Sequence, residues 1–154
     1  MSIIKSQKTK LILSWAAVVL WMLLIFHSSS QVADQSNKLS KGVTKAIIET
    51  VEKVAPEANF DMASINHYVR KNAHFFAYLT LGILVLNAVK GNKVDGVASY
   101  VMAFGVCVLY AISDEVHQLF VPGRGGQLKD VLIDSTGAIV GIGLYMLGSR
   151  IRRK

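Results

Sequence analysis

Three short groups of polar residues could carry chemistry in this sequence, and each stands at the end of an apolar tract. The first group consists of Arg70, Lys71, His74 and Tyr78. Lys71, His74 and Tyr78 are three and four residues apart, which places them on one face of a helix. Arg70 reaches His74 at a spacing of four. Cationic side chains beside a histidine suit a phosphate or carboxylate ligand.

The second group follows the third apolar tract and reads Ser113-Asp114-Glu115-Val116-His117-Gln118. On a helix, Asp114 faces the same way as His117 and Gln118. A histidine near a carboxylate makes an oriented general base, or a nucleophile for phosphoryl or acyl chemistry. A route through Ser113 lacks the strand–turn–helix motif that usually presents a nucleophilic serine.

The third group opens the last apolar tract with Asp130 and Asp134, which share a helix face with Gly137 and Gly141. The Gly137-x-x-x-Gly141 spacing lets a neighbouring helix pack at close range. The sequence therefore predicts that both aspartates point into a helix bundle rather than at lipid.

These groups give two sets of candidate residues. The expected catalytic set is His74, His117, Asp114, Glu115 and Asp130. The expected substrate-binding set is Arg70, Lys71, Tyr78, Gln118, Arg124 and Asp134. A purely structural interpretation pairs His74 with Asp134, or either of them with an arginine, to lock the bundle. Packing alone has no need of so many titratable groups at one depth, because each costs about 2.5–3.5 kcal/mol inside a membrane span.

The same carboxylates and histidines could instead hold a divalent cation. No His-Glu-x-x-His motif is present, and Asp114-x-x-His117 alone is a weak signal. The single cysteine, Cys107, belongs to no metal-binding motif and cannot form an intrachain disulfide. The sequence therefore does not decide whether a divalent cation is bound or which residues would hold it.

Four apolar tracts must position these groups, and they predict membrane spans at about 9–26, 72–89, 96–113 and 131–148. A tract of 18 helical residues is about 27 Å long, close to one hydrocarbon thickness. Backbone groups in lipid must bond internally, so each tract is expected to be a helix. We expect an all-α, four-helix transmembrane bundle that forms a single membrane domain over residues 1–154.

Charge predicts the orientation and argues against nucleic acid as a partner. The net charge is +7, but the basic residues stand at the ends of the apolar tracts. Nine of them lie in three short segments that carry one acid, Asp95: Lys5, Lys8, Lys10, Lys90, Lys93, Arg150, Arg152, Arg153 and Lys154. The positive-inside rule makes these segments, and both termini, cytoplasmic. The polar groups then lie at the outer face.

Residues 27–69 are expected to form an external segment with an amphipathic helix. Its apolar stripe is Leu39, Val43, Ile47, Val51 and Val54, and Pro56 ends the pattern. Such a helix can lie along the outer interface or cover the bundle. An alternative for residues 1–30 is a cleaved signal peptide with Ser28 and Ser30 before the cut, but Trp15 and Trp21 favour a retained span.

Two loops connect the remaining spans. Lys90–Asp95, with Gly91 and Asn92, predicts a tight turn that makes spans two and three an antiparallel hairpin. The outer loop contains Pro122-Gly123-Arg124-Gly125-Gly126. Its proline and glycines exclude a continuing helix and let the backbone approach another group closely.

At these residues the chain resembles the VanZ-like family of bacterial membrane proteins. The resemblance rests on Arg70-Lys71-x-x-His74-x-x-x-Tyr78, Ser113-Asp114-Glu115-x-His117-Gln118, Pro122-Gly123-Arg124 and Asp130 with Asp134-x-x-Gly137. It implies a multi-pass protein of the bacterial cell membrane with a role in the cell envelope, and a link to low-level teicoplanin resistance. The family's grouping with phosphatidylserine synthases implies transfer or hydrolysis of a lipid headgroup.

Three functions remain open on the sequence. The first is an enzyme that processes a lipid headgroup or a lipid-linked precursor, with His74 or His117 as base or nucleophile. The second is a non-catalytic protein that binds or shields an envelope component. The third, a transporter, is disfavoured because the inner halves of the spans hold no ionisable residues. Convergence of the histidines and carboxylates around a pocket would favour the enzyme.

Overall fold

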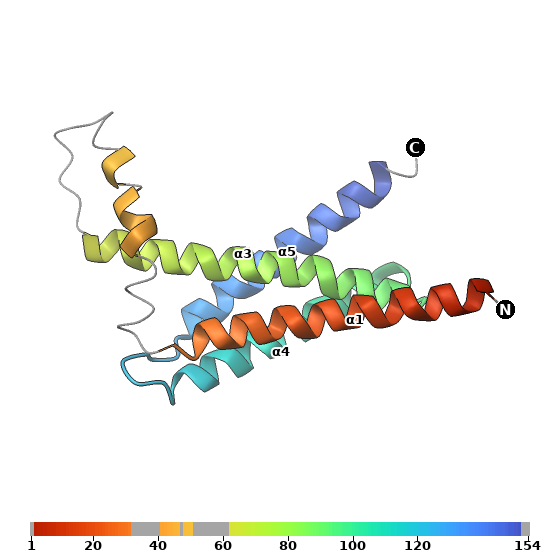
Figure 1. The fold of residues 1–154 in the computed structure, drawn as a ribbon, viewed down its shortest axis with the longest axis horizontal. Coiled ribbons are helices and arrows are strands. Elements are labelled where there is room, and N and C mark those ends of the chain that lie inside the picture. Colours follow the sequence, from red (N-terminus) through yellow and green to blue (C-terminus); the bar gives the residue numbers. More distant parts are fainter. Residues whose placement is uncertain (1, 32–40, 47, 51–61, 152–154) are drawn as a thin grey trace.

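The structure is a computed structural model that describes residues 2–31, 41–46, 48–50 and 62–151. Four long helices dominate it: α1 (Ser2–Ser29), α3 (Met62–Gly91), α4 (Gly96–Gln118) and α5 (Leu128–Ile151). No strand occurs in the described ranges. In Figure 1, α1, α3 and α4 run along the long axis of the molecule, and α5 crosses them obliquely. The expected all-α fold is confirmed.

All four helices are long and apolar enough to cross a membrane. Their outward surfaces carry large apolar side chains, such as Leu20, Val101, Leu109 and Leu132, each more than 60% exposed. Water would make such surfaces costly, whereas lipid tails are as apolar as the side chains. The chain is therefore an integral, multi-pass membrane protein.

The helices are longer than the apolar tracts that predicted them. α3 begins at Met62 rather than at 72, and α4 continues to Gln118 rather than ending at 113. Apolar composition marks the part of a helix that lies in lipid, and it says nothing of where the hydrogen-bonded helix itself stops. No proline or glycine interrupts residues 62–71 or 114–118. The polar groups consequently stand on helices rather than in loops.

Between α1 and α3, the described residues 41–46 and 48–50 are helical, within the segment for which a helix was expected. Thr44 and Ile48, four residues apart, form its buried face. Thr44 Oγ1 donates a hydrogen bond to Asn66 Oδ1 of α3 at 3.2 Å. Of the predicted apolar stripe, Val43 lies within the described residues and is 54% exposed. The other four members, Leu39, Ile47, Val51 and Val54, lie outside them.

α3 and α5 touch backbone to backbone through glycine. A Cβ atom on Gly137 would collide with the carbonyl oxygen of Phe75, and one on Gly141 would collide with that of Leu79. From the other side, a Cβ on Gly82 would lie 2.6 Å from the carbonyl oxygen of Ala138. The close approach predicted from Gly137-x-x-x-Gly141 is confirmed.

α1 packs against α3 and α4 as a retained span does. Trp21 Nε1 donates to the carbonyl oxygen of Ala77 at 2.8 Å, and the Tyr110 hydroxyl donates to that of Met22 at 2.5 Å. Val18 is buried in the interior of the bundle. These contacts attach α1 to the rest of the bundle.

The tight turn between α3 and α4 is confirmed, with α3 ending at Gly91 and α4 starting at Gly96. Lys93 adopts a positive φ of 64° to close it. Both termini and this turn lie at one end of the bundle, and the loop between α4 and α5 lies at the other (Figure 1). The bundle thus separates its basic termini and turn from its polar groups.

Candidate functional site at one end of the bundle

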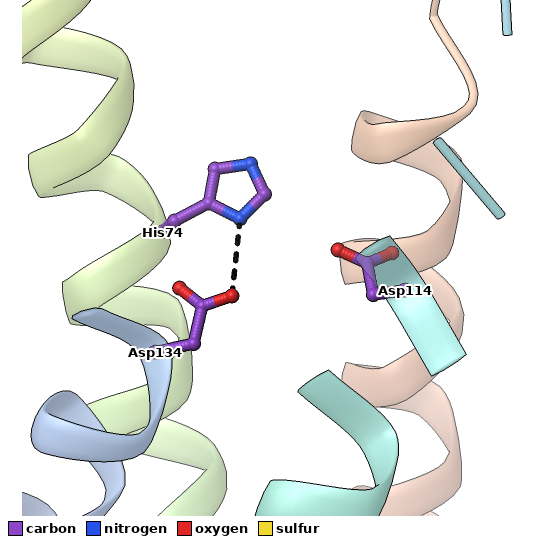
Figure 2. Close-up of side chains that lie close together, drawn as sticks. All are labelled: His74, Asp114 and Asp134. Atoms are coloured by element: carbon purple, nitrogen blue, oxygen red, sulfur yellow. Dashed lines mark ion pairs between the residues drawn. The ribbon is translucent and has the colours of Figure 1, made fainter. Parts of the chain in front are cut away.

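His74, Asp114 and Asp134 converge from three different helices. One donor atom from each lies within 4.8 Å of the other two. His74 Nδ1 is 3.8 Å from Asp134 Oδ2, and Asp114 points toward the same space from α4 (Figure 2). Asp134 is 0% exposed and Asp114 is 2% exposed. Residues 60 positions apart in sequence therefore form one centre, which we call the trio.

Asp114 is held by a hydrogen bond that the sequence did not predict. Ser29, at the end of α1, donates from Oγ to Asp114 Oδ2 at 2.8 Å, and this contact is buried. Gln118 Nε2 lies 3.4 Å from the same oxygen. The sequence does contain a signal for this contact, the polar run Ser28-Ser29-Ser30 directly after an apolar tract. The same serines also fit a signal-peptide cleavage site, so the run alone does not indicate the hydrogen bond.

Glu115 joins α4 to the loop that follows it. Its Oε2 accepts from the backbone N–H of Gln127 at 2.8 Å, and its Oε1 accepts from Gln118 Nε2 at 3.1 Å. A Cβ on Gly126 would lie 2.5 Å from the Glu115 carbonyl oxygen, so only glycine fits there. The close backbone approach expected of this loop is thus made against the end of α4.

Arg124 reaches back from that loop over the end of the bundle. Its Nη1 donates to Gln118 Oε1 at 3.4 Å, and its Nη2 donates to the carbonyl oxygen of Ser28 at 3.3 Å. Burial lowers the pKa of the Arg124 guanidinium and the nearby Arg70 lowers it further, while Asp114 and Glu115 raise it. A guanidinium nevertheless stays charged in proteins. It therefore places a cation beside the trio.

Lys71 and Asp130 form an ion pair at the rim of the site. Lys71 Nζ lies 2.9 Å from Asp130 Oδ1, and the two side chains are 22% and 26% exposed. The pair joins α3 to α5 one turn outward from His74 and Asp134. Asp130 is therefore placed near the trio without belonging to it.

Two predicted site residues lie beside the trio without belonging to it. His117 faces α1, with Nε2 3.2 Å from Ser30 Oγ and its ring 4.4 Å from that of Phe26. Tyr78 is 0% exposed, and its ring lies 6.1 Å from that of Tyr110. Neither residue lines the cavities described next. Of the two histidines expected to act as base, the structure brings His74 to the centre.

Two cavities meet at this end of the bundle. The first is a polar pocket of about 30 Å³, room for one or two water molecules. It is lined by His67, Arg70, Lys71, His74, Glu115, Gln118, Arg124, Asp130, Ile133 and Asp134. The second is a groove of about 590 Å³ between α1 and α3 with a mainly apolar lining, including Trp21, Leu24, Ile25, Val43, Val69 and Phe76. Arg70, His74 and Arg124 line both.

The family follows from a comparison with family models. The model of the VanZ/LLP1 family matches residues 14–149. This chain belongs to the VanZ/LLP1 family. The match extends from α1 through α5 and includes each residue of the trio, so the resemblance drawn from the polar motifs is confirmed. Neither the curated proteins nor the solved structures give a match to this VanZ/LLP1 chain.

Proposed function

We propose that this VanZ/LLP1 protein is an enzyme that acts on a membrane lipid with a phosphate-containing headgroup, or on a lipid-linked envelope precursor. The observation that supports it best is that the polar pocket and the apolar groove share Arg70, His74 and Arg124. A lipid has the same construction, since an anionic headgroup is joined directly to an apolar chain.

The groove suits the apolar part of such a ligand. Its volume of about 590 Å³ falls in the usual range for ligand pockets, about 300–1,000 Å³. Trp21, Leu24 and Ile25 line it from α1, and Phe76 lines it from α3. A chain that lies between these two helices would bring its headgroup to the two arginines, which bind phosphate oxygens through paired N–H groups.

His74 lines both cavities and can move a proton at the headgroup position. Asp134 Oδ2 lies nearest its Nδ1, which leaves Nε2 to act on the substrate. As the oxygen of water or an alcohol attacks phosphorus, Nε2 takes the proton from that oxygen. The bond from phosphorus to the leaving headgroup oxygen breaks, and that oxygen receives the proton from Nε2. Water as nucleophile gives hydrolysis, and an alcohol gives headgroup transfer.

We propose that the lipid-binding site lies at the outer leaflet and that both termini lie in the cytoplasm. The start of α1, the α3–α4 turn and the end of α5 lie at the end of the bundle opposite the α4–α5 loop (Figure 1). These segments carry Lys8, Lys10, Lys90, Lys93 and Arg150. The positive-inside rule assigns that end to the cytoplasm. The substrate is then a lipid of the outer leaflet of the bacterial cell membrane.

Quantitative lipid profiling of cells that express matched variants tests the proposal. Wild type is compared with His74→Ala, with Arg124→Lys, and with His27→Ala as the control. His27 is an exposed histidine at the end of α1 that lines neither cavity. We expect wild type and the control to deplete one lipid and accumulate its product. His74→Ala should abolish that change, and Arg124→Lys should reduce it about 10-fold or more, because a lysine cannot replace two parallel N–H donors.

Identical lipid and precursor profiles in cells with and without the wild-type protein would overturn the enzyme proposal. Co-purification of one lipid with wild type but not with Arg124→Lys would, in that case, identify a protein that binds an envelope lipid without changing it.

A link to glycopeptide resistance is a narrower form of the same proposal. If the substrate is a lipid-linked cell-wall precursor, wild type should raise the minimal inhibitory concentration of teicoplanin and His74→Ala should not. Equal concentrations for wild type, His74→Ala and empty vector would contradict this narrower form.

A further inference from the structure

The environment of the Asp134 carboxylate indicates a bound ion. The Asp134 side chain is 0% exposed inside a membrane-spanning helix, yet neither carboxylate oxygen has a hydrogen-bond partner among the residues that the structure describes. Buried carboxylates are ordinarily hydrogen-bonded, paired or bound to a metal, because an uncompensated charge in an apolar medium is very costly. His74 Nδ1 lies 3.8 Å from Asp134 Oδ2, beyond hydrogen-bonding distance.

Asp114 has an open oxygen as well. Ser29 and Gln118 contact Oδ2, whereas Oδ1 is buried without a hydrogen-bond partner. Each of the two carboxylates and the His74 ring offers a donor atom to one shared space, and Figure 2 shows all three side chains pointing into it.

We propose that His74, Asp114 and Asp134 bind one divalent first-row transition-metal ion, with Mn²⁺ or Zn²⁺ as the fitting class. One imidazole nitrogen with two carboxylates is a mixed ligand set, which suits these ions better than the all-oxygen sets of Ca²⁺ and Mg²⁺. Two ionised carboxylates balance the charge of the ion, and binding gives the buried Asp134 carboxylate a partner.

The donor separations fit such an ion after a small closure. An ion about 2.1 Å from each donor holds the donors about 3.0–3.4 Å apart. The trio atoms lie within 4.8 Å of one another, and the His74–Asp134 pair is already at 3.8 Å. Side-chain rotations that shift the donor atoms by roughly 1 Å would close the site without moving the helices. The adjoining pocket of about 30 Å³ has room for a water molecule on the ion.

The hydrogen bond from Ser29 to Asp114 resembles those that surround metal ligands in proteins. Ser29 orients Asp114 by a buried hydrogen bond, as hydrogen bonds commonly orient the carboxylate ligands of metals. The catalytic consequence rests on the proposed function: an ion at this place would activate a water molecule beside the two arginines. His74 would then be a ligand, and the ion would replace it as the activating group.

Direct metal binding tests the site without any lipid. The full chain, purified in detergent and treated with EDTA, is titrated with Mn²⁺ while electron paramagnetic resonance follows the free ion. Zn²⁺ is measured by elemental analysis after dialysis. Asp134→Asn is the test variant and Asp114→Asn the second, because Ser29 can still donate to its amide oxygen. Asp95→Asn is the matched control, an exposed aspartate at the opposite end of the bundle.

We expect about one ion per chain for wild type and Asp95→Asn, and binding at least about 10-fold weaker for both trio variants. The ion should also raise the unfolding temperature of wild type and leave that of Asp134→Asn unchanged. Wild-type binding no stronger than that of the two trio variants overturns the inference. A chain that binds the ion yet leaves the lipid profile unchanged keeps the metal site and contradicts the proposed enzyme. A lipid change that depends on His74 in a chain that binds no ion supports the proposed enzyme and contradicts the metal site.

Discussion

Gly137 of α5 lies against the carbonyl oxygen of Phe75, the residue that follows His74 in α3. Asp134 precedes Gly137 by three residues and so lies on the same face of α5. The contact of the two backbones therefore fixes how closely Asp134 can approach His74. The packing of the bundle and the geometry of the trio depend on the same glycine.

Replacing Gly137 by alanine should destabilise the protein and open the trio. The new Cβ would overlap the Phe75 carbonyl oxygen, so α3 and α5 must separate, at a cost of about 1–3 kcal/mol. Thermal unfolding of the purified protein in detergent measures this. Gly143→Ala is the control, because a Cβ there meets nothing within 4 Å. Unfolding temperatures for Gly137→Ala and Gly143→Ala that match would show that the two backbones are not in contact.

Replacing Ser29 by alanine should loosen the attachment of α1 to the site. The change removes the buried donor to Asp114 Oδ2 and leaves that oxygen the longer contact from Gln118 Nε2 at 3.4 Å. Loss of one such hydrogen bond costs about 0.5–1.5 kcal/mol. Ser149→Ala is the matched control, since Ser149 Oγ donates to the carbonyl oxygen of Met146 within its own helix and Ser149 lines neither cavity. Thermal unfolding and the lipid assay should both separate the two variants, and equal behaviour would mean that the hydrogen bond contributes nothing.

Lys71 and Asp130 should show a measurable coupling energy. A double-mutant cycle with Lys71→Met and Asp130→Asn should give a coupling energy of about 0.5–1 kcal/mol, because both partners are partly buried at 2.9 Å. The matched control is a cycle on Lys45 and Glu49, whose side chains are 72% and 59% exposed at 3.7 Å. There we expect no coupling beyond error. A larger coupling in the exposed pair would contradict the ranking by burial.

Reporter fusions should find both termini and the α3–α4 turn in the cytoplasm. A green fluorescent protein joined after Lys154 should fluoresce, and alkaline phosphatase at the same place should be inactive, because it folds only outside. Phosphatase inserted after Gly125, in the loop between α4 and α5, should be active. The opposite pattern would place the trio at the inner leaflet and remove the outer-leaflet substrate from the proposal.

The apolar tracts were sufficient to predict four membrane helices, because lipid requires each spanning segment to bond its own backbone. The ends of those helices were not predictable in the same way. Residues 62–71 and 114–118, which mix polar and apolar side chains, continue the helices beyond the predicted apolar tracts. Helical spacing correctly placed Asp134, Gly137 and Gly141 on the face that meets α3.

The sequence by itself determined which residue types gather at one end of the bundle, since span order alternates the loops between the two membrane faces. It could not rank His74 above His117, because both stand at helix ends beside carboxylates. The tertiary structure decided this: the glycine contact brings α5 to His74, whereas His117 turns toward Ser30 of α1. The role of Ser29 also came from the tertiary structure, because a hydrogen bond between residues 85 positions apart depends on helix packing that no local pattern encodes.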